Sequence, residues 1–317
     1  MPGTTAPIAA IVPTRNRVTA LCRMVDALLR QDVLPAELIV VDASANDETR
    51  KLLVALDANA TCRGCRIVWI KAERAGAAAQ RNQGIACTAQ PFVAFFDDDI
   101  VFEEHCLRRL HAALQADARL GGVNAMIVNQ CYRAPGFVSR AVFRIMAGGP
   151  ASSYAGRVVG PAINLLPEDS AILPEVVAVD WLNTTCTLYR REALPQPPFS
   201  VNFAGYSMME DLALSLVVGR RWKLANVRTA RVLHDSQPAA DKADAAAMSR
   251  MELVNRHYVM TQVLGRRGLR DYLKLLVWEK FQLAVCLWQS RGGRRFWQML
   301  WGKCLGFGDL LAGKGVR

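Results

Sequence analysis

The sequence lacks any apolar run long enough to cross a membrane, since no stretch reaches the roughly 18 uninterrupted apolar residues that a spanning helix requires. The nearest candidate, residues 275–288, is interrupted by Glu279 and Lys280. The N-terminus also lacks the layout of a secretory signal, because the apolar run at residues 8–12 is short and is followed by Pro13 and charged residues. We therefore expect a soluble or surface-bound protein, cytoplasmic and at most peripheral on the inner face of a membrane.

Two phosphate-binding signatures are also missing from the chain. No GxGxxG motif follows the apolar run at residues 8–12, and GxxxxGK[ST] occurs nowhere. Both motifs supply the glycine-rich backbone that cradles phosphate groups at the start of a helix. Their absence argues against a dinucleotide-binding fold and against a P-loop enzyme.

The cysteines form no disulfide framework. There are 9 of them, an odd number at irregular spacing, which favours a reducing compartment. Cys62 and Cys65 have the spacing of a metal-binding pair, but no second pair and no histidine cluster accompanies them. We favour a pair of loop thiols over a zinc site.

What the chain does contain is a regular alternation of strand-like and helix-like segments over its first third. With 317 residues, of which 52% are hydrophobic, it can bury a sizeable core. The apolar runs typical of strands lie at residues 8–12, 38–42, 66–70 and 91–96. This alternation predicts right-handed βαβ crossovers and an α/β fold, Rossmann-like, with a mostly parallel sheet and flanking helices.

The alternation of strands and helices becomes irregular after the fourth predicted strand. Residues 131–179 are rich in Gly, Pro and Ser and predict loops or a flap over a site. Strand character resumes at residues 181–189, and a last pair of strands is predicted at residues 222–227 and 230–233.

The fourth predicted strand ends in three consecutive carboxylates, Asp97, Asp98 and Asp99. Adjacent acids repel one another unless a cation, a positive ligand or water screens them. Carboxylate oxygens suit Mg²⁺ or Mn²⁺, so a divalent metal site is one interpretation and a solvated acidic turn is the other. Ligands of parallel sheets bind beyond the carboxyl ends of the strands, where other polar residues, Arg15, Asn16 and Asp42, are also expected.

Four motifs, in this order along the chain, resemble those of the inverting nucleotide-sugar glycosyltransferases of family 2, which have the GT-A fold. They are Val12-Pro13-Thr14-Arg15-Asn16-Arg17, Ala79-Gln80-Arg81-Asn82-Gln83-Gly84, Phe96-Asp97-Asp98-Asp99 and Glu210-Asp211. The resemblance covers roughly residues 8–235. It implies a catalytic GT-A domain at residues 1–240, followed by a basic, aromatic-rich helical region at residues 241–317.

The resemblance implies a donor site for a nucleoside-diphosphate sugar and a divalent metal, Mg²⁺ or Mn²⁺. Its metal ligands would be Asp97 and Asp99, joined by His234, although a lone histidine at a strand end is as often structural. The residues that contact the nucleotide or its phosphates would be Pro13, Thr14, Arg15, Asn16, Asp42, Arg81, Asn82, Asp97 and Asp98. Without the resemblance, Arg81 would be interpreted as an arginine on a helix surface.

On the acceptor side, the resemblance implies that Asp211 is the base that takes the proton of the attacking hydroxyl, with inversion at the anomeric carbon. Glu210, Trp181 and Asn183 would line the acceptor site. Two acids at the start of a helix also stabilise it through the helix dipole, and a buried tryptophan explains Trp181 equally well.

One departure from the family pattern concerns the nucleotide base. Many relatives carry a second acid after the second strand, which pairs with uracil, whereas here Asp42 is followed by Ala43. A donor with another base, such as dTDP or GDP, is therefore an open alternative to UDP.

The C-terminal region concentrates positive charge, with 13 Lys and Arg against 4 Asp and Glu from Arg250 to Arg317. It predicts helices in three pieces, broken at residues 265–268 and 292–293. Aromatic, aliphatic and basic residues alternate there, which suits contact with an anionic membrane surface. The alternative is an appendage that packs on the catalytic domain with a solvated basic face. No nucleic-acid-binding motif accompanies the charge.

We therefore expect a metal-dependent, hexosyl-type glycosyltransferase that acts on a hydroxyl of a glycan or lipid-linked acceptor, in cell-surface polysaccharide or glycoconjugate synthesis. A different class of protein would keep the fold without catalysis and bind a nucleotide or a partner at the membrane. The retained Glu210-Asp211 pair argues against that class. A sugar-phosphate nucleotidyltransferase is also disfavoured, since its Gly-rich basic loop after the first strand is absent.

Overall fold

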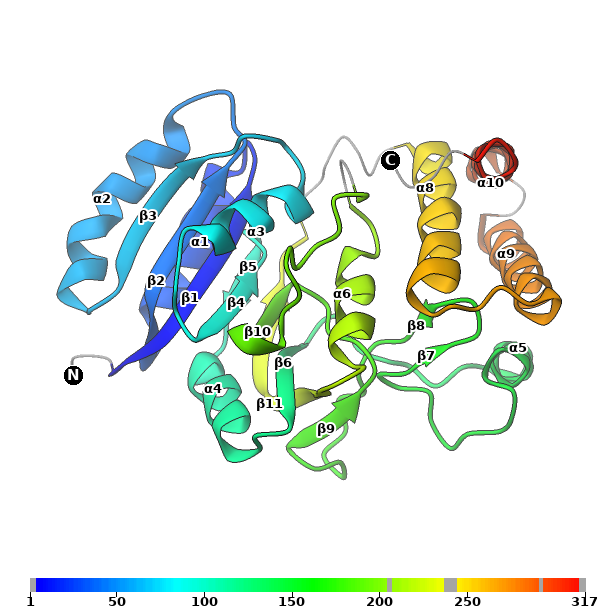
Figure 1. The fold of residues 1–317 in the computed structure, drawn as a ribbon, viewed down its shortest axis with the longest axis horizontal. Helices are drawn as coiled ribbons and strands as arrows, with labels where there is room; N and C mark the ends of the chain where they lie inside the picture. The colour runs from blue at the N-terminus through cyan, green and yellow to red at the C-terminus, as the bar shows by residue number, and fades with distance from the viewer. Residues whose placement is uncertain (1–3, 204–206, 237–243, 291–292, 314–317) are drawn as a thin grey trace.

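A computed structural model describes residues 4–203, 207–236, 244–290 and 293–313 of the chain. Its main feature is one mixed sheet, whose strands lie in the order β3-β2-β1-β4-β10-β6-β11-β5, with β9 paired to β11 (Figure 1). The strands are β1 (Thr4–Thr14), β2 (Val33–Asp42), β3 (Arg66–Lys71), β4 (Phe92–Phe96), β5 (Ile100–Phe102), β6 (Leu120–Ile127), β9 (Val176–Val179), β10 (Cys186–Arg190) and β11 (Lys223–His234).

The first four strands are parallel, and they form the part of the sheet that the sequence predicts. Successive residues of β1 face opposite sides, as the pleat requires. Ile8, Ala10 and Val12 pack in one core, while Ala9 and Ile11 pack in the other. Both faces are therefore covered, which explains why these strands are apolar throughout.

Helices cover the two faces of the sheet. Side chains of α1 (Val18–Leu29), α2 (Glu48–Cys62) and α4 (Cys106–Ala116) belong to the first core. Side chains of α3 (Ala77–Ala86) and α6 (Glu210–Val218) belong to the second. The order of strands reverses at β1, between β2 and β4, so the carboxyl ends of β1 and β4 meet where a ligand of such a sheet is expected.

The later part of the chain differs from the prediction in three respects. Residues 131–179 are not only loops, because they contain the helix α5 (Phe137–Ala147), the short hairpin β7 (Val158–Val159) and β8 (Ile163–Asn164), and β9. The strand predicted from residue 181 begins only at Cys186. The predicted last pair of strands is one strand, β11, whose pairing with β6 shifts register between Val227 and Arg231. That shift explains why its apolar pattern is interrupted.

The C-terminal region is helical, as predicted. It consists of α8 (Ala245–Tyr258), one turn of π-helix (Val259–Val263), α9 (Leu269–Ser290) and α10 (Arg294–Leu311). The predicted break at residues 265–268 is confirmed, whereas residue 292 of the second break lies outside the described residues, as does the predicted domain boundary at residue 240. None of the described helices is long and apolar enough to cross a membrane.

The C-terminal helices pack against one another closely. A Cβ atom on Gly302 of α10 would lie 2.1 Å from the backbone oxygen of Ala246 in α8, so only glycine allows this approach. The Lys303 ammonium forms a buried ion pair with Glu279 of α9. Figure 1 shows that α8, α9 and α10 lie at the end of the molecule opposite α2.

Candidate active site

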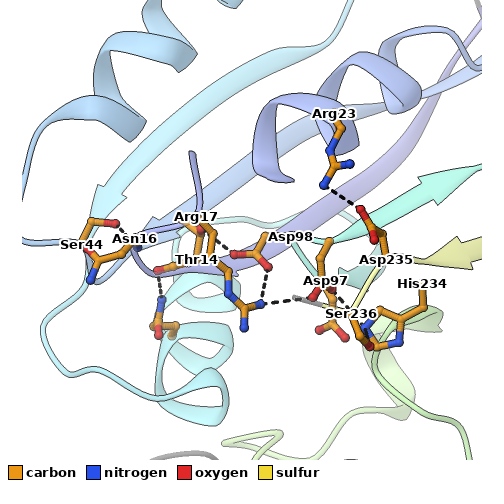
Figure 2. Close-up of polar contacts among 12 residues, drawn as sticks. Thr14, Asn16, Arg17, Arg23, Ser44, Asp97, Asp98, His234, Asp235 and Ser236 are labelled. Carbon is orange, nitrogen blue, oxygen red and sulfur yellow. Dashed lines mark hydrogen bonds and ion pairs between the residues drawn. The ribbon is translucent and has the colours of Figure 1, made fainter. Parts of the chain in front are cut away.

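Three carboxylates follow β4 and point in different directions. Asp98 turns toward β1, where it accepts hydrogen bonds from the Thr14 hydroxyl at 2.7 Å and from the Arg17 guanidinium at 3.1 Å (Figure 2). Burial, reinforced by Asp99 and Asp97 and opposed by Thr14 and Arg17, raises the pKa of Asp98 to about 6. Asp98 is therefore fixed within the protein, and Asp97 and Asp99 are left to face the candidate metal position.

Asp97, Asp99 and His234 form a cluster that could hold a metal ion, with one ligand atom from each lying within 4.8 Å of the others. His234 ends β11, whose antiparallel pairing with β5 sets it opposite Ile100, the residue after Asp99. Its Nε2 atom is 3.1 Å from an oxygen of Asp99. Two carboxylates and one imidazole are a donor set that suits Mn²⁺ or Mg²⁺, so these residues fit the predicted metal.

Arg17 is a site residue that the sequence motif contained but did not single out. Its guanidinium contacts both Asp98 and Asp99, at 3.1 and 3.2 Å. Asn16, just before it, has a φ of 55°, a left-handed conformation in which the chain turns sharply. Arg17 thereby turns back toward the acids, while the neighbouring Arg15 is exposed.

Arg81 joins the acids after β4 to those at the start of α6. It is buried in α3, and its two terminal nitrogens pair with Asp97 at 2.7 Å and with Glu210 at 2.9 Å. The guanidinium also lies over the Phe199 ring, 5.5 Å from its centre. Arg81 is therefore not the surface arginine of the alternative interpretation.

Glu210 and Asp211 open α6 beside this arginine. Burial, followed by the charge of Asp211, raises the pKa of Glu210 well above its usual range, and Arg81 opposes this rise. Burial also raises the pKa of Asp211 to about 6. The Asp211 side chain is half-buried and accepts a hydrogen bond from the Leu212 amide at 2.7 Å. Of the two acids, Glu210 is held by Arg81, whereas Asp211 forms no ion pair with a described residue.

Two more of the predicted nucleotide contacts, Asp42 and Asn82, also have protein partners. Asp42 is fully buried and accepts hydrogen bonds from the Ser44 amide at 2.8 Å and the Trp69 indole at 3.2 Å. Asn82 forms a pair of hydrogen bonds, 2.7 and 3.0 Å long, with the backbone of Phe199. Both side chains order loops around the site in the described structure.

Four further predicted residues are also described by the structure. The Asn16 amide donates to the Ser44 hydroxyl at 2.7 Å, and Pro13 lies at the end of β1, half-buried. The Trp181 indole donates to the Leu165 carbonyl at 2.8 Å and is buried. The Asn183 side-chain oxygen is buried without a hydrogen-bond partner among the described residues, so it is free to receive a donor from a ligand.

The sheet order and the acids at its switch point agree with the predicted GT-A fold, and comparison with known proteins supports this fold. Residues 9–144 match the family model described as Glycosyl transferase family 2. Residues 9–144 are therefore assigned to glycosyltransferase family 2, and the solved structures described next share the GT-A fold. A search of curated proteins found no match.

Two solved structures with the same fold contain a bound nucleotide and Mn²⁺. One is the mannosyltransferase PcManGT from Pyrobaculum calidifontis in complex with GDP-Man and Mn²⁺, with 15% identity, a TM-score of 0.55, and coverage of 98% of this chain and 77% of that one. The other is GalNAc-T7 with UDP, GalNAc and Mn²⁺, with 15% identity, a TM-score of 0.50, and coverage of 72% and 43% respectively. At these identities the likeness concerns the fold.

Proposed function

We propose that this protein is an inverting glycosyltransferase that moves a hexosyl-type sugar from a nucleoside-diphosphate sugar to a hydroxyl of a glycan or lipid-linked acceptor. One observation carries the proposal. Arg81 pairs with Asp97 on one side and Glu210 on the other, and so brings the acids after β4 next to Asp211. Groups suited to the donor and to the acceptor thus occupy one site, as a direct displacement between the two substrates requires.

The donor side consists of Asp97, Asp99 and His234 as ligands for Mg²⁺ or Mn²⁺, which, when bound, would neutralise the charge of the leaving diphosphate. Asp98 and Thr14 hold the acid run in place from β1. The guanidinium of Arg81 is suited to phosphate or ribose oxygens. The fold neighbours contain GDP-Man in one case and UDP in the other, and a thermal-shift test with nucleoside diphosphates distinguishes the two bases.

On the acceptor side we assign Asp211 as the base and Glu210, Trp181 and Asn183 as acceptor contacts. With a pKa near 6, Asp211 is mostly ionised at neutral pH, yet basic enough to take the acceptor proton. As the acceptor oxygen bonds to the anomeric carbon, its proton passes to Asp211. The bond from that carbon to the diphosphate oxygen breaks, and the nucleoside diphosphate leaves with the electron pair. Attack from the opposite face inverts the anomeric centre.

The activity test uses Asp211→Asn, which keeps the shape of the side chain and removes the base. We expect sugar transfer to fall by roughly 10² to 10⁴-fold, the usual contribution of a general base. The matched control is Asp57→Asn on α2, which is exposed and should transfer sugar at the wild-type rate. Transfer unaffected by Asp211→Asn would refute the assigned base. A product with retained anomeric configuration, measured by NMR, would refute inversion.

The donor is identified separately by thermal shift. A diphosphate that binds only the folded state raises the melting temperature by mass action, so one nucleoside diphosphate should stabilise the protein more with Mn²⁺ than without it. Asp99→Asn should remove this Mn²⁺-dependent increment. If Mn²⁺ had no effect with any diphosphate, the proposed metal site would be wrong.

We also propose that the acceptor is met at the inner face of a membrane, which the protein contacts through its C-terminal helices. The exposed tryptophans and the excess of Lys and Arg in this region support that contact. The proposed pathway is cell-surface polysaccharide or glycoconjugate synthesis.

A further inference from the structure

Helix α9 is apolar on two opposite faces. One face is buried against the rest of the protein and includes Leu275 and Trp278. The other carries a stripe at helical spacing, in which the exposed fractions run from 40% to 78%: Leu269, Tyr272, Leu273, Leu276 and Val277. A contiguous apolar stripe on an outward face marks an interaction surface, since single exposed apolar residues are normal but continuous patches are not.

Helix α5, which the sequence did not predict, extends this apolar surface. Its residues Phe137, Val138 and Ile145 are 91%, 68% and 56% exposed. The helix is anchored beside α9 through Phe143, whose ring centre lies 5.8 Å from that of Trp278. Figure 1 shows α5 and α9 together at the end of the molecule opposite α2, with α10 nearby.

A groove of about 630 Å³ lies between α5 and α9 and combines apolar and cationic side chains. Its apolar walls include Ile145, Leu273 and Val277, and its cations are Arg144, Arg270 and Lys274. The groove therefore presents positive charge at the border of the apolar surface.

Two of these three cations have no acidic partner among the described residues, and the third, Lys274, donates a hydrogen bond to the Met146 carbonyl at 2.7 Å. Neither Arg144 nor Arg270 forms an ion pair with a described residue. Burial, followed by the charges of Arg270 and Arg266, lowers the pKa of Lys274, although Asp271 opposes this. Asp271 itself accepts a hydrogen bond from the Gly268 amide at 3.1 Å, at the start of α9. An anion in the groove would relieve this repulsion.

We propose that α5 and α9 together form a docking face for an anionic lipid bilayer. The apolar stripe enters the boundary of the acyl chains, and lipid phosphate groups bind Arg144, Arg270 and Lys274. A second copy of this chain would bring two positive grooves together, which disfavours a dimer through this face. The inference builds on the membrane contact proposed above, which named only the C-terminal helices, and adds α5 and a binding groove to it.

The test is co-sedimentation of the full chain with vesicles of phosphatidylcholine alone or mixed with phosphatidylglycerol. Arg144→Gln combined with Arg270→Gln removes two of the three groove charges, and Leu273→Ser combined with Val277→Ser removes part of the stripe. The changed side chains are exposed, and circular dichroism and melting temperature verify that each variant is folded.

Matched controls lie at the opposite end of the molecule. Arg30→Gln combined with Lys51→Gln removes two exposed charges near α1 and α2, and Val54→Ser removes an apolar side chain of α2 that is 70% exposed. Asp211→Asn tests binding without transfer activity.

We expect binding to the anionic vesicles only, weakened by about fivefold for each groove charge removed and abolished by high salt. The stripe variant should also bind less, while the controls and Asp211→Asn should bind like the wild type. Equal binding by the groove variant and its charge control would overturn the proposal. So would a wild-type dimer in solution that the stripe variant converts to a monomer. Failure of vesicle binding with normal sugar transfer would refute this inference and the membrane contact on which it rests, and would leave the proposed enzyme intact.

Discussion

The buried contacts of Arg81 predict a large and pH-dependent effect of replacing it with methionine. Arg81 is 2% exposed and pairs with Asp97 at 2.7 Å and with Glu210 at 2.9 Å. Methionine retains much of the apolar stem of the side chain but removes its charge and its hydrogen-bond donors. Glu210, itself 9% exposed, then remains buried without its cation.

The expected loss follows from the burial of that carboxylate. Removing one partner of a buried ion pair typically lowers the free energy of unfolding by about 3–5 kcal/mol. This is a large part of the roughly 5–15 kcal/mol that stabilises a typical domain. Arg81→Met should therefore leave a protein that is folded but easily unfolded.

The loss should depend on pH, because Arg81 lowers the pKa of Glu210 and its removal allows that pKa to rise further. Because the pKa of Glu210 is raised in the folded state, its protonated form stabilises the fold fully below the unfolded-state pKa, near 4.5. This stabilisation is lost as the pH rises through the folded-state pKa. The difference between wild type and Arg81→Met should thus be smaller at about pH 5 than at about pH 8.5.

The assay is urea unfolding at both pH values, with Arg66→Met as the matched control. Arg66 pairs with Glu37 at the same 2.7 Å distance, but its side chain is 65% exposed. An exposed pair is worth about 1 kcal/mol at most, so this control should lose little stability at either pH. The reasoning would be refuted if Arg81→Met lost no more than Arg66→Met, or if its loss were equal at the two pH values.

Three further predictions concern catalysis and packing. The pKa of Asp211, raised by burial to about 6, predicts that kcat/KM falls about tenfold per pH unit below that value, and a profile flat to about pH 4.5 would contradict its role as base. Asn82→Ala removes two hydrogen bonds to the loop before α6 and should lower the free energy of unfolding in urea by about 1–3 kcal/mol, whereas Asn82→Asp keeps the acceptor and should lose less. Gly302→Ala would place a methyl group 2.1 Å from the backbone of α8 and should lower the free energy of unfolding by about 1–3 kcal/mol. Gly308→Ala, with nothing within 4 Å of its new Cβ atom, should instead raise the melting temperature. Equal melting temperatures for the two variants would contradict this account of the packing.

The parallel half of the fold could be predicted because its signals are local. Strands β1 to β4 are short apolar runs, and α1 has apolar residues at helical spacing, so neighbouring residues suffice to identify them. In the other half, β10 lies antiparallel between β4 and β6, an arrangement of segments that are far apart in the sequence. Helix α5 was missed although its apolar residues lie at helical spacing, because the Gly, Pro and Ser residues around it were interpreted as loops.

By itself, the sequence determined the chemistry available to the site. The acids Asp97 to Asp99 come at the end of a strand whose apolar residues fix it in the sheet, and this places them at its edge. Their resemblance to a family motif, together with Arg81 and Asp211, predicted a site for a metal and a nucleotide sugar. The family match confirms the fold on which that site rests.

Only the tertiary structure decided which side chains meet. Arg17 rather than Arg15 contacts the acids, because the backbone turns through a left-handed residue between them. Arg81 meets Glu210, 129 residues away in the chain, because α3 and α6 cover the same face of the sheet. Such contacts depend on how distant elements pack, and that packing is set by the burial of whole faces rather than by the residues next to each motif.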